Sequence, residues 1–420
     1  MNFTPHLQIY HLGPIEHGDI QLSRMMVLNG PQAAGKSTIA KAIFFFRTVK
    51  DEFLKLFFVP AADPVPELNA RYYLRLKFRQ IFGESMAWKD DMYLSYEYVP
   101  GVKIEVGSAL KYGAPITFSP PIIEWMNEKR YSQVDYTKKE ALQAELEDLF
   151  QDNHEIVYIP AGRSMLSVLS NHLNYIMAML DDKQKDMIDY CVRNYIERVM
   201  KVRPMLSQEG FTDSFLNDAN HIFDLNYMNE SMWHILKGHY QYIDGKEQLR
   251  FFHQKKETHI PINFASSGQQ EVLWILNLIY YYIIINKPTT FIIEEPEAHL
   301  YPDGQKQIVE FIALSLAKLN ECLITTHSPY ILGALNNLLD ARRLKDKGII
   351  LGPVLEESNL LGTQLLCRES FSAYFVNKGS TEDAMDDETG MIRNELIDGA
   401  SDTINRFADK LFELERKNEV

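Results

Sequence analysis

The 420-residue sequence predicts an α/β fold. We expect a mixed β-sheet with a parallel core around a phosphate-binding loop, an N-terminal antiparallel β subdomain and an inserted helical lobe. Three observations predict this fold. An apolar run at residues 25–28 leads into a glycine-bounded loop and then a helical pattern. Strand, helix and strand patterns alternate over residues 290–325, which is typical of a parallel sheet. Residues 164–235 are helical in pattern almost throughout.

The glycine-bounded loop has the spacing G-x-x-x-x-G-K-S, the signature of a P-loop between a strand and a helix. Backbone N–H groups of such a loop and of the helix start converge on one concavity and favour phosphate oxygens. The Lys36 ammonium adds charge beside the β- and γ-phosphates, and the Ser37 hydroxyl is a Mg²⁺ ligand. A plain glycine turn before a basic helix is the alternative. The predicted ATP and Mg²⁺ site comprises Asn29, Gly30, Pro31, Gln32, Ala33, Ala34, Gly35, Lys36, Ser37 and Thr38.

The other elements of the first half follow from periodicity and turn residues. Residues 71–79 alternate apolar and basic residues, which indicates an amphipathic strand. A solvated strand face explains its basic residues as well as a nucleic-acid contact does. The predicted elements are two strands within 1–28, a helix over 39–59, strands over 71–79, 93–99 and 102–106, a helical segment over 121–150 and a core strand over 154–159.

The second half returns from helices to strands after the helical lobe. An Asp244-Gly245 turn indicates a hairpin, because this dipeptide suits a tight two-residue turn. The predicted elements are a hairpin over 238–253, helices over 271–285 and 303–319, strands over 290–295, 321–325, 347–351 and 373–376, and a charged helix over 392–416. We expect four units: residues 1–160, 161–236, 237–345 and 346–420.

Composition limits the function. The net charge of −14 argues against a surface built for non-specific DNA binding. The three cysteines are far apart in the sequence, which favours reduced thiols. No signal peptide is visible, and the longest apolar run, residues 274–285, is too short to span a membrane. We therefore expect a cytoplasmic protein without a membrane partner.

Three further motifs carry chemistry. Glu294 and Glu295 end a predicted strand, where Glu294 can bind Mg²⁺ and Glu295 can position or deprotonate a water molecule. Ser267 and Gly268 open a predicted helix, where N–H groups and the helix dipole favour a γ-phosphate. His327 follows a third strand and can contact the phosphate or the water. The alternatives are a helix-cap cluster for the glutamates, a capping serine, and a structural histidine.

The order of these motifs resembles an ATP-binding-cassette (ABC) ATPase of the branch that contains SMC-type and OLD-like ATPases. In that branch an insertion separates the P-loop half of the head from the half that carries signature, acidic strand and histidine. Here the gap runs from Ser37 to Ser266. Two departures are Gln269, where many cassettes have a second glycine, and Glu294, where aspartate is usual.

The resemblance implies the roles of several residues. Ser267, Gly268 and Gln269 of one subunit would close over ATP held by the P-loop of another, which predicts an ATP-dependent head-to-head dimer or a higher homo-oligomer. Gln80 is a candidate for the glutamine that senses Mg²⁺ and water, with a surface position as the alternative. Arg163 lies after a core strand and is expected either at the nucleotide and dimer face or in a capping role.

The resemblance also suggests three cellular roles. Stand-alone ATPases of this branch resemble the ATPase subunits of bacterial anti-phage systems such as PARIS and Septu, in which the ATPase senses infection and controls a separate effector, for example a nuclease encoded nearby. The second role is a DNA-maintenance ATPase that clamps DNA. The third is an ATP-locked scaffold with little turnover. The DNA contact would use the basic strand residues Arg71, Arg75, Lys77 and Arg79. We expect no nuclease in the same chain, because no well-spaced acidic cluster follows His327.

Overall fold

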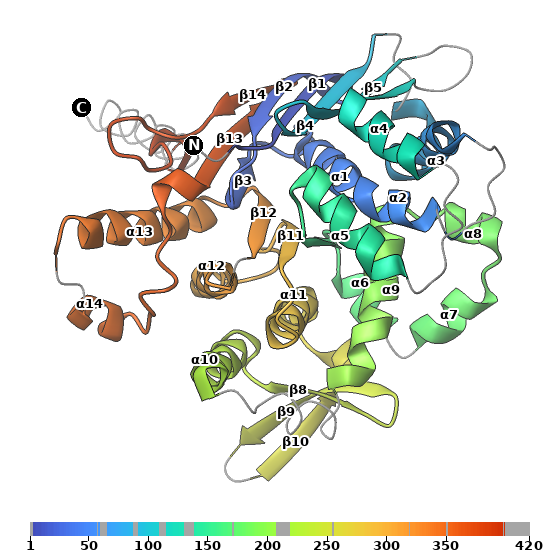
Figure 1. The fold of residues 1–420 in the computed structure, drawn as a ribbon. Coiled ribbons are helices and arrows are strands. Elements are labelled where there is room, and N and C mark those ends of the chain that lie inside the picture. Colours follow the sequence, from blue (N-terminus) through green and yellow to red (C-terminus); the bar gives the residue numbers. More distant parts are fainter. Residues whose placement is uncertain are drawn as a thin grey trace, which may run out of the picture.

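A computed structural model of the chain shows its elements in space (Figure 1). It describes residues 3–56, 58, 65–86, 91–108, 115–129, 138–169, 172–206, 219–253, 256–318, 320–349, 352–397 and 399.

One large sheet organises the molecule. Its eleven strands lie in the order β6-β5-β4-β1-β2-β14-β13-β3-β12-β11-β7. Their bounds are β1 His6–Leu12, β2 Ile15–Gln21, β3 Met25–Asn29, β4 Tyr93–Val99, β5 Val102–Gly107, β6 Ile116–Phe118, β7 Glu155–Ile159, β11 Thr289–Glu294, β12 Glu321–Thr326, β13 Phe371–Asn377 and β14 Ser380–Asp383. The predicted α/β class with a mixed sheet is confirmed.

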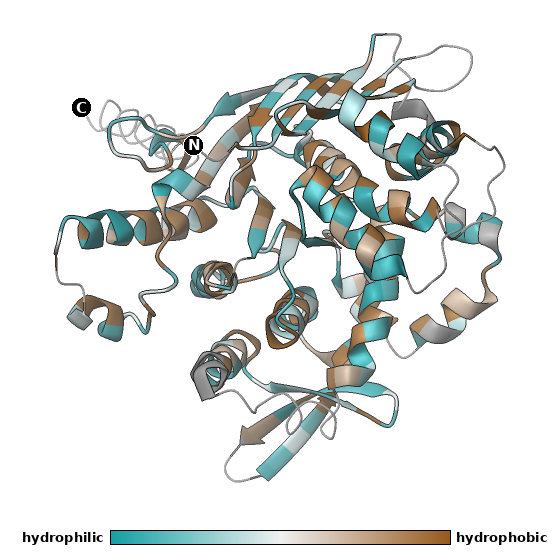
Figure 2. Ribbon diagram, in the orientation of Figure 1, coloured by the Kyte–Doolittle hydropathy of each residue, from teal (hydrophilic) through white to brown (hydrophobic). Residues whose placement is uncertain are grey.

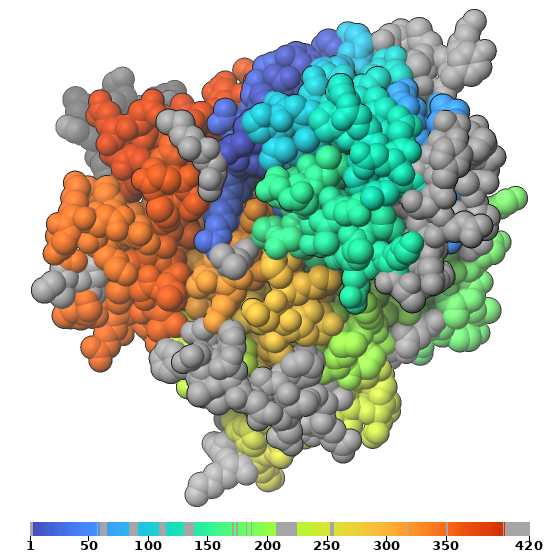
Figure 3. Space-filling model, in the orientation of Figure 1, coloured from blue at the N-terminus to red at the C-terminus, as the bar shows by residue number. Residues whose placement is uncertain are grey.

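The sheet has two regions of different strand direction. Strands β7, β11, β12, β3 and β13 are parallel to one another, and β6, β5, β4, β1 and β2 pair antiparallel. Strand β14 joins the regions, because it pairs antiparallel with β13 and parallel with β2. The space-filling view shows the N-terminal strands beside the C-terminal segment, from opposite ends of the sequence (Figure 3).

Helices cover both faces of the parallel strands. Because successive side chains of a strand point to opposite faces, alternate residues contact opposite layers of helices. On β3, Met25 and Val27 join one core while Met26 and Leu28 join the other. The first core packs against α9 (Tyr190–Val202), α10 (Ala219–Leu236), α11 (Ser267–Ile284), α12 (Pro302–Leu316) and α13 (Pro329–Asp346). The second packs against α1 (Lys36–Arg47), α2 (Val49–Leu56), α3 (Pro66–Met86), α4 (Pro120–Glu128) and α5 (Lys139–Phe150).

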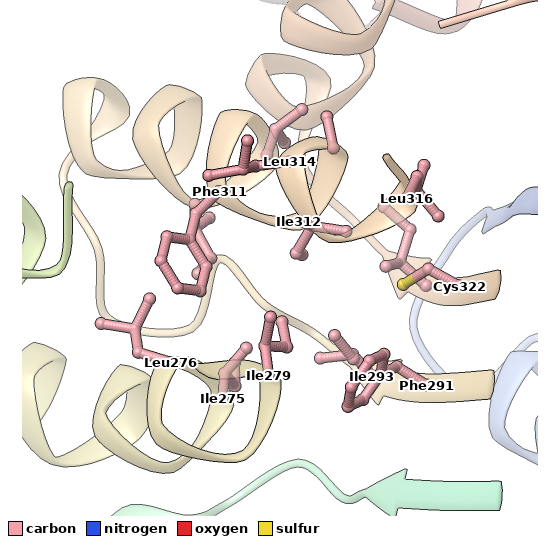
Figure 4. Packing of buried hydrophobic residues seen from close by; sticks show 14 of the residues in the cluster. Ile275, Leu276, Ile279, Phe291, Ile293, Phe311, Ile312, Leu314, Leu316 and Cys322 are labelled. Atoms are coloured by element: carbon pink, nitrogen blue, oxygen red, sulfur yellow. The ribbon is translucent and has the colours of Figure 1, made fainter. Parts of the chain in front are cut away.

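Helix α11 lies at the centre of the first core. Its residues are buried from Gln270 to Ile279, and Figure 2 shows mostly apolar residues along it. Figure 4 shows Ile275, Leu276 and Ile279 facing side chains of α12, β11 and β12. Burial on this scale, roughly 2 kcal/mol for each large apolar side chain, fixes the start of α11 relative to the ends of β11 and β12.

The helical lobe and a small separate sheet follow β7. The short helices are α6 (Ser164–Val168), α7 (Leu173–Met179), α8 (Asp182–Asp186) and the 3₁₀ turn η3 (Arg203–Leu206). The antiparallel three-stranded sheet contains β8 (His239–Ile243), β9 (Lys246–His253) and β10 (Lys256–Pro261), so the predicted hairpin is confirmed. The 3₁₀ turn η4 (Ile262–Phe264) leads to α11; α14 (Gly352–Glu357) and the 3₁₀ turn η5 (Arg368–Ser370) precede β13.

The strand predicted over 71–79 is wrong, because these residues lie in helix α3. Buried Leu74, Phe78 and Ile81 follow the i, i+4, i+7 spacing of a helix, whereas Tyr72 and Leu76 are exposed. The basic strand face expected there for DNA therefore does not exist.

Smaller corrections concern element ends. The helix predicted over 39–59 is divided at Thr48, whose hydroxyl donates to the Phe44 and Phe45 carbonyls. Helices α4 and α5 replace the single segment 121–150, with residues 130–137 outside the described chain. Residues 347–349 follow α13 as a turn, not a strand. Ile392 forms a bridge with Met385, so the predicted helix does not begin there, and residues 401–416 lie outside the description.

None of the helices in the described ranges combines the length and apolar character needed to cross a bilayer.

Candidate nucleotide site

The parallel strands bring the predicted motifs to one edge of the sheet. Register pairs Asn29 with Thr326 and Glu294 with Thr325, so β3, β12 and β11 end level with one another. The P-loop follows β3, Glu295 follows β11, and His327 follows β12. Ligands of open α/β sheets bind at this carboxyl edge, because the connecting loops gather there.

Two glycines shape the P-loop. Gly30 has φ = 152°, and a Cβ at this position would overlap the backbone carbonyl of Val376 on β13. Gly35 caps α1 with φ = 104°, and a Cβ there would overlap the Ile15 side chain. Each residue therefore combines a left-handed backbone with a close neighbour, which only glycine tolerates. Pro31, Gln32 and Ala33 are exposed between them, Ala34 is half-buried, and Asn29 and Thr38 are buried beside the loop.

Lys36 is 4% exposed and folds back onto the loop. Its Nζ donates to the carbonyl oxygens of Gly30 (2.8 Å) and Pro31 (2.9 Å). Burial lowers the pKa of Lys36 to about 8, although the nearby carboxylates of Glu295 and Glu297 act in the opposite direction. A buried ammonium held mainly by neutral carbonyls is stabilised by an anion, so Lys36 fits a phosphate group.

His327 connects Lys36 to Glu295. The Lys36 Nζ lies 3.2 Å from His327 Nδ1, and His327 Nε2 lies 3.2 Å from Glu295 Oε1. An ammonium only donates, so Nδ1 accepts and the neutral ring carries its proton on Nε2, facing Glu295. The side chains of His327 and Glu295 remain 32% and 39% exposed, which leaves this pair accessible to a water molecule.

Glu294 lies beside this pair but on the α1 face of the sheet. It is 6% exposed, and its Oε2 accepts from the Ala161 N–H (3.1 Å). Its Oε1 is buried and makes no hydrogen bond of ordinary geometry among the described residues, although burial and the Glu294 carboxylate raise the pKa of the nearby Tyr158 hydroxyl. Helix α1, whose first turn carries the exposed Ser37, packs over β11 on this same face. A buried carboxylate oxygen and an accessible hydroxyl at one edge fit the oxygen ligands of Mg²⁺.

Glu297 is a third carboxylate that sequence reasoning left without a role. Its Oε1 accepts from the Thr326 hydroxyl (2.7 Å) and from the His327 backbone N–H (2.8 Å). It therefore fixes the direction in which the chain leaves β12, and with it the His327 ring. The glutamate two residues after Glu295 in Glu-Glu-Pro-Glu was the available signal.

The hydrogen bonds described for Ser266 and Gln269 at the start of α11 do not reach the P-loop or His327. Ser266, not Ser267, is the N-cap, and it forms a capping box with Gln269. The Gln269 side chain also donates to the Leu236 carbonyl (2.6 Å), so the hydrogen bonds described for Gln269 stabilise the start of α11. Ser267 is exposed at the first helical position. Gly268 packs on the 294–299 segment, because a Cβ there would lie 2.7 Å from the His299 carbonyl oxygen.

Gln80 lies within helix α3, because the strand predicted over 71–79 is part of this helix. The residues around it face the end of α1 and the start of α2: Lys77 binds Glu52 (2.8 Å), and Phe78 packs on Phe45. These contacts do not bring Gln80 to the P-loop, and its role as a Mg²⁺ sensor stays a prediction.

Arg163 is buried rather than placed at an exposed face. Its guanidinium donates to the carbonyl oxygens of Pro160, Glu294 and Glu295 and to that of Glu271 on α11. The sequence predicted that Arg163 follows a core strand, but it did not indicate the partners of Arg163 that lie more than 100 residues away.

Comparison with known families gives one match. Residues 124–332 match the model of the AAA ATPase domain family. The matched segment includes α11, β11, β12 and His327, and the P-loop lies before it. This match supports an ATPase domain, which implies nucleotide binding. No curated protein matches the sequence of the chain.

Comparison with solved structures finds similarity to three SMC heads, at low sequence identity and low TM-score. An SMC head bound to the C-winged helix domain of ScpA is 10% identical, with a TM-score of 0.38, over 91% of this chain and 97% of that one. The SMC head domain from Thermotoga maritima is 11% identical, with a TM-score of 0.36, over 80% and 92%. An SMC head with an extended coiled coil, bound to the C-terminal domain of ScpA derived from Pyrococcus furiosus, is 11% identical, with a TM-score of 0.40, over 90% and 96%.

Proposed function

We propose that the chain binds ATP with Mg²⁺ at the P-loop and hydrolyses it to ADP and phosphate. The observation that carries this proposal is the line of contacts Lys36–His327–Glu295 at the carboxyl edge of the parallel sheet. It puts a phosphate-binding cation, a polar relay and an accessible carboxylate side by side, and the matched ATPase domain family supports it.

Each residue has a role in this proposal. The loop N–H groups and Lys36 hold the phosphates, and Glu295 orients the attacking water and accepts its proton. His327 donates from Nε2 to Glu295 and keeps its carboxylate turned toward the phosphate side. Ser37 and Glu294 would hold Mg²⁺, which would neutralise phosphate charge. The described residues contain no cluster of three or more His, Cys, Asp or Glu side chains suited to a metal, so this ion would depend on the nucleotide.

We also propose that a second copy completes the site. One chain supplies one P-loop and one α11 start, and none of the described hydrogen bonds of Ser266 or Gln269 reaches the P-loop. Large apolar side chains are exposed close to these motifs: Met165, Phe264, Tyr301 and Tyr330 are 57–77% exposed. Burial of such a surface between two heads would bring Ser267 and Gly268 of one copy to ATP held by the other.

The test of the catalytic assignment is Glu295→Gln. This variant keeps the P-loop and Lys36, so ATP binding should persist while turnover stops. The ATP-bound dimer should then accumulate, as measured by size-exclusion chromatography with light scattering. Hydrolysis by Glu295→Gln at the wild-type rate would show that the assignment is wrong.

For the cellular role we propose control of a separate effector in anti-phage defence, in the cytoplasm. The support is the resemblance of the motif set to ATPase subunits of such systems, so the role rests on analogy. The test is co-purification with the product of the neighbouring gene, followed by phage challenge of cells that carry both genes. Protection that survives Glu295→Gln or deletion of the neighbour contradicts the proposal.

The two alternative roles remain weaker. For DNA clamping, the expected basic strand is a helix in which Arg71 binds Glu67 and Lys77 is buried against Glu52. A scaffold without turnover does not need Glu295 and His327 to meet. A salt-dependent DNA-binding assay tests the first alternative, and steady-state phosphate release tests the second.

A further inference from the structure

Arg163 joins three segments of the site through a guanidinium with no exposed surface. Its Nη1 donates to the carbonyl oxygens of Pro160 (2.7 Å) and Glu294 (2.6 Å), and its Nη2 donates to that of Glu295 (2.9 Å). Its Nε donates to the carbonyl oxygen of Glu271 on α11 (2.8 Å). One side chain therefore binds the end of β7, the end of β11 and the second turn of α11.

Glu271 returns the contact. Its two carboxylate oxygens accept the backbone N–H groups of Arg163 and Ser164, each at 3.0 Å, and its side chain lies 3.4 Å from Arg163 Nε. Both residues are nearly inaccessible to solvent. A buried charge pair with this many hydrogen bonds holds a defined geometry, because any displacement leaves a charged group unpaired.

The backbone of Glu295 needs such support. Its φ of 42° lies in the left-handed region, which is unfavourable for a residue with a Cβ. The Glu295 N–H donates to the Thr325 carbonyl (2.9 Å), and its own carbonyl accepts from Arg163. The residue is thus held from β12 on one side and by Arg163 on the other.

A second contact ties the same two segments. Gly268, one turn before Glu271, packs directly on the His299 carbonyl, four residues after Glu295. The start of α11 and the segment 294–299 are therefore linked twice, directly at Gly268 and through the Arg163 side chain, so movement of one displaces the other.

We propose that Arg163 is a positioning residue that holds Glu295 in its left-handed, hydrolysis-competent conformation and links it to the start of α11. Binding of Ser267 and Gly268 to nucleotide on a second copy then acts on Glu295 through Glu271 and Arg163. In the dimer, each chain takes part in two nucleotide sites, one through its P-loop and one through the start of α11, and this contact links the two. The inference rests on the proposed ATPase function.

The test compares nucleotide binding with turnover in full-length Arg163→Ala and Arg163→Lys. A misplaced carboxylate costs turnover on the order of 100-fold, whereas the P-loop contacts are untouched. We expect kcat to fall by about that factor in Arg163→Ala, with the dissociation constant of a fluorescent ATP analogue within twofold of wild type. Arg163→Lys keeps the charge but not the planar fork, so it should be intermediate. Added ethylguanidinium should restore part of kcat in Arg163→Ala alone.

Arg203→Ala is the matched control. Arg203 is also buried and paired with a glutamate, Glu247 (3.4 Å), but it lies beside the three-stranded sheet. It should lose thermal stability without a change in kcat. Arg163 and Glu271 act as a unit, so Arg163→Ala combined with Glu271→Ala should lose no more kcat than the worse single variant.

The outcomes separate this inference from the function on which it rests. If wild type hydrolyses ATP and Glu295→Gln does not, but Arg163→Ala and Arg163→Lys keep wild-type kcat, the positioning role is refuted and the ATPase assignment stands. If nucleotide binding falls in parallel with kcat and ethylguanidinium restores neither, Arg163 is only structural. If Arg163→Ala does not fold, Arg163→Lys decides by the same measurements. If wild type lacks hydrolysis, the proposed function itself fails.

Discussion

Replacement of His327 should separate catalysis from stability. Its ring makes two side-chain contacts, to Lys36 and to Glu295, each at 3.2 Å and each involving a partly exposed group. Long hydrogen bonds in contact with water stabilise a fold by about 0.5 kcal/mol each, so His327→Leu should change the free energy of unfolding by about 1 kcal/mol. Removal of a preorganised donor beside Glu295, the proposed catalytic carboxylate, should lower kcat by about 100-fold, a barrier increase of about 2.7 kcal/mol.

The assay is single-turnover ATP hydrolysis, with urea unfolding of the same preparations. His327→Gln is the matched variant, because its amide can donate to Glu295 and accept from Lys36, and it should retain more activity than His327→Leu. Single-turnover conditions exclude product release as the cause of a change. Hydrolysis by His327→Leu within twofold of wild type, or a stability loss large enough to explain the activity loss, would refute the reasoning.

Three further predictions follow from single contacts. Lys36→Ala should abolish both turnover and ATP-dependent assembly; light scattering that shows wild-type assembly with ATP contradicts this. Gly268→Ala places a Cβ against the His299 carbonyl and should destabilise the fold by about 1–3 kcal/mol in urea unfolding; an unchanged midpoint contradicts the packing. Burial raises the pKa of Glu155, but Arg198 and Lys287 together outweigh burial, and the pKa falls to about 2. The lowered pKa contributes at most about 3 kcal/mol to the free energy of unfolding, and this contribution is present above pH 4.5 and lost as the pH falls toward 2. In Glu155→Gln the free energy of unfolding should therefore depend less on pH between 4.5 and 2. An unchanged slope of the free energy against pH contradicts this prediction.

The sequence alone was sufficient to predict the candidate site residues that lie at the ends of parallel strands. The P-loop, Glu294, Glu295 and His327 each follow an apolar strand, and parallel register alone brings such strand ends together. Each motif also has a characteristic spacing of residue types, so it can be recognised in a single sequence.

Helix α3 was mispredicted because its sequence fits two periods. Tyr72, Leu74, Leu76 and Phe78 alternate as in a strand, while Leu74, Phe78 and Ile81 repeat as in a helix. Packing against α1 and α2 decides between them, since it buries the helical set and leaves Tyr72 and Leu76 exposed. No local signal contains that information, because the partner surface comes from other parts of the chain.

The three glutamates of Glu-Glu-Pro-Glu show how backbone geometry separates roles that the sequence presents together. Glu294 continues the strand and points into the α1 face, where it is buried. If β11 continued, Glu295 would point into the opposite face, among the apolar residues around α11. Its left-handed conformation ends the strand instead, so the carboxylate stays half-exposed beside His327, and Glu297 turns back to bind the end of β12. One unfavourable φ therefore places a buried carboxylate, the proposed Mg²⁺ ligand, and an accessible one, the proposed catalytic base, on adjacent residues, and Arg163 is the group placed to maintain it.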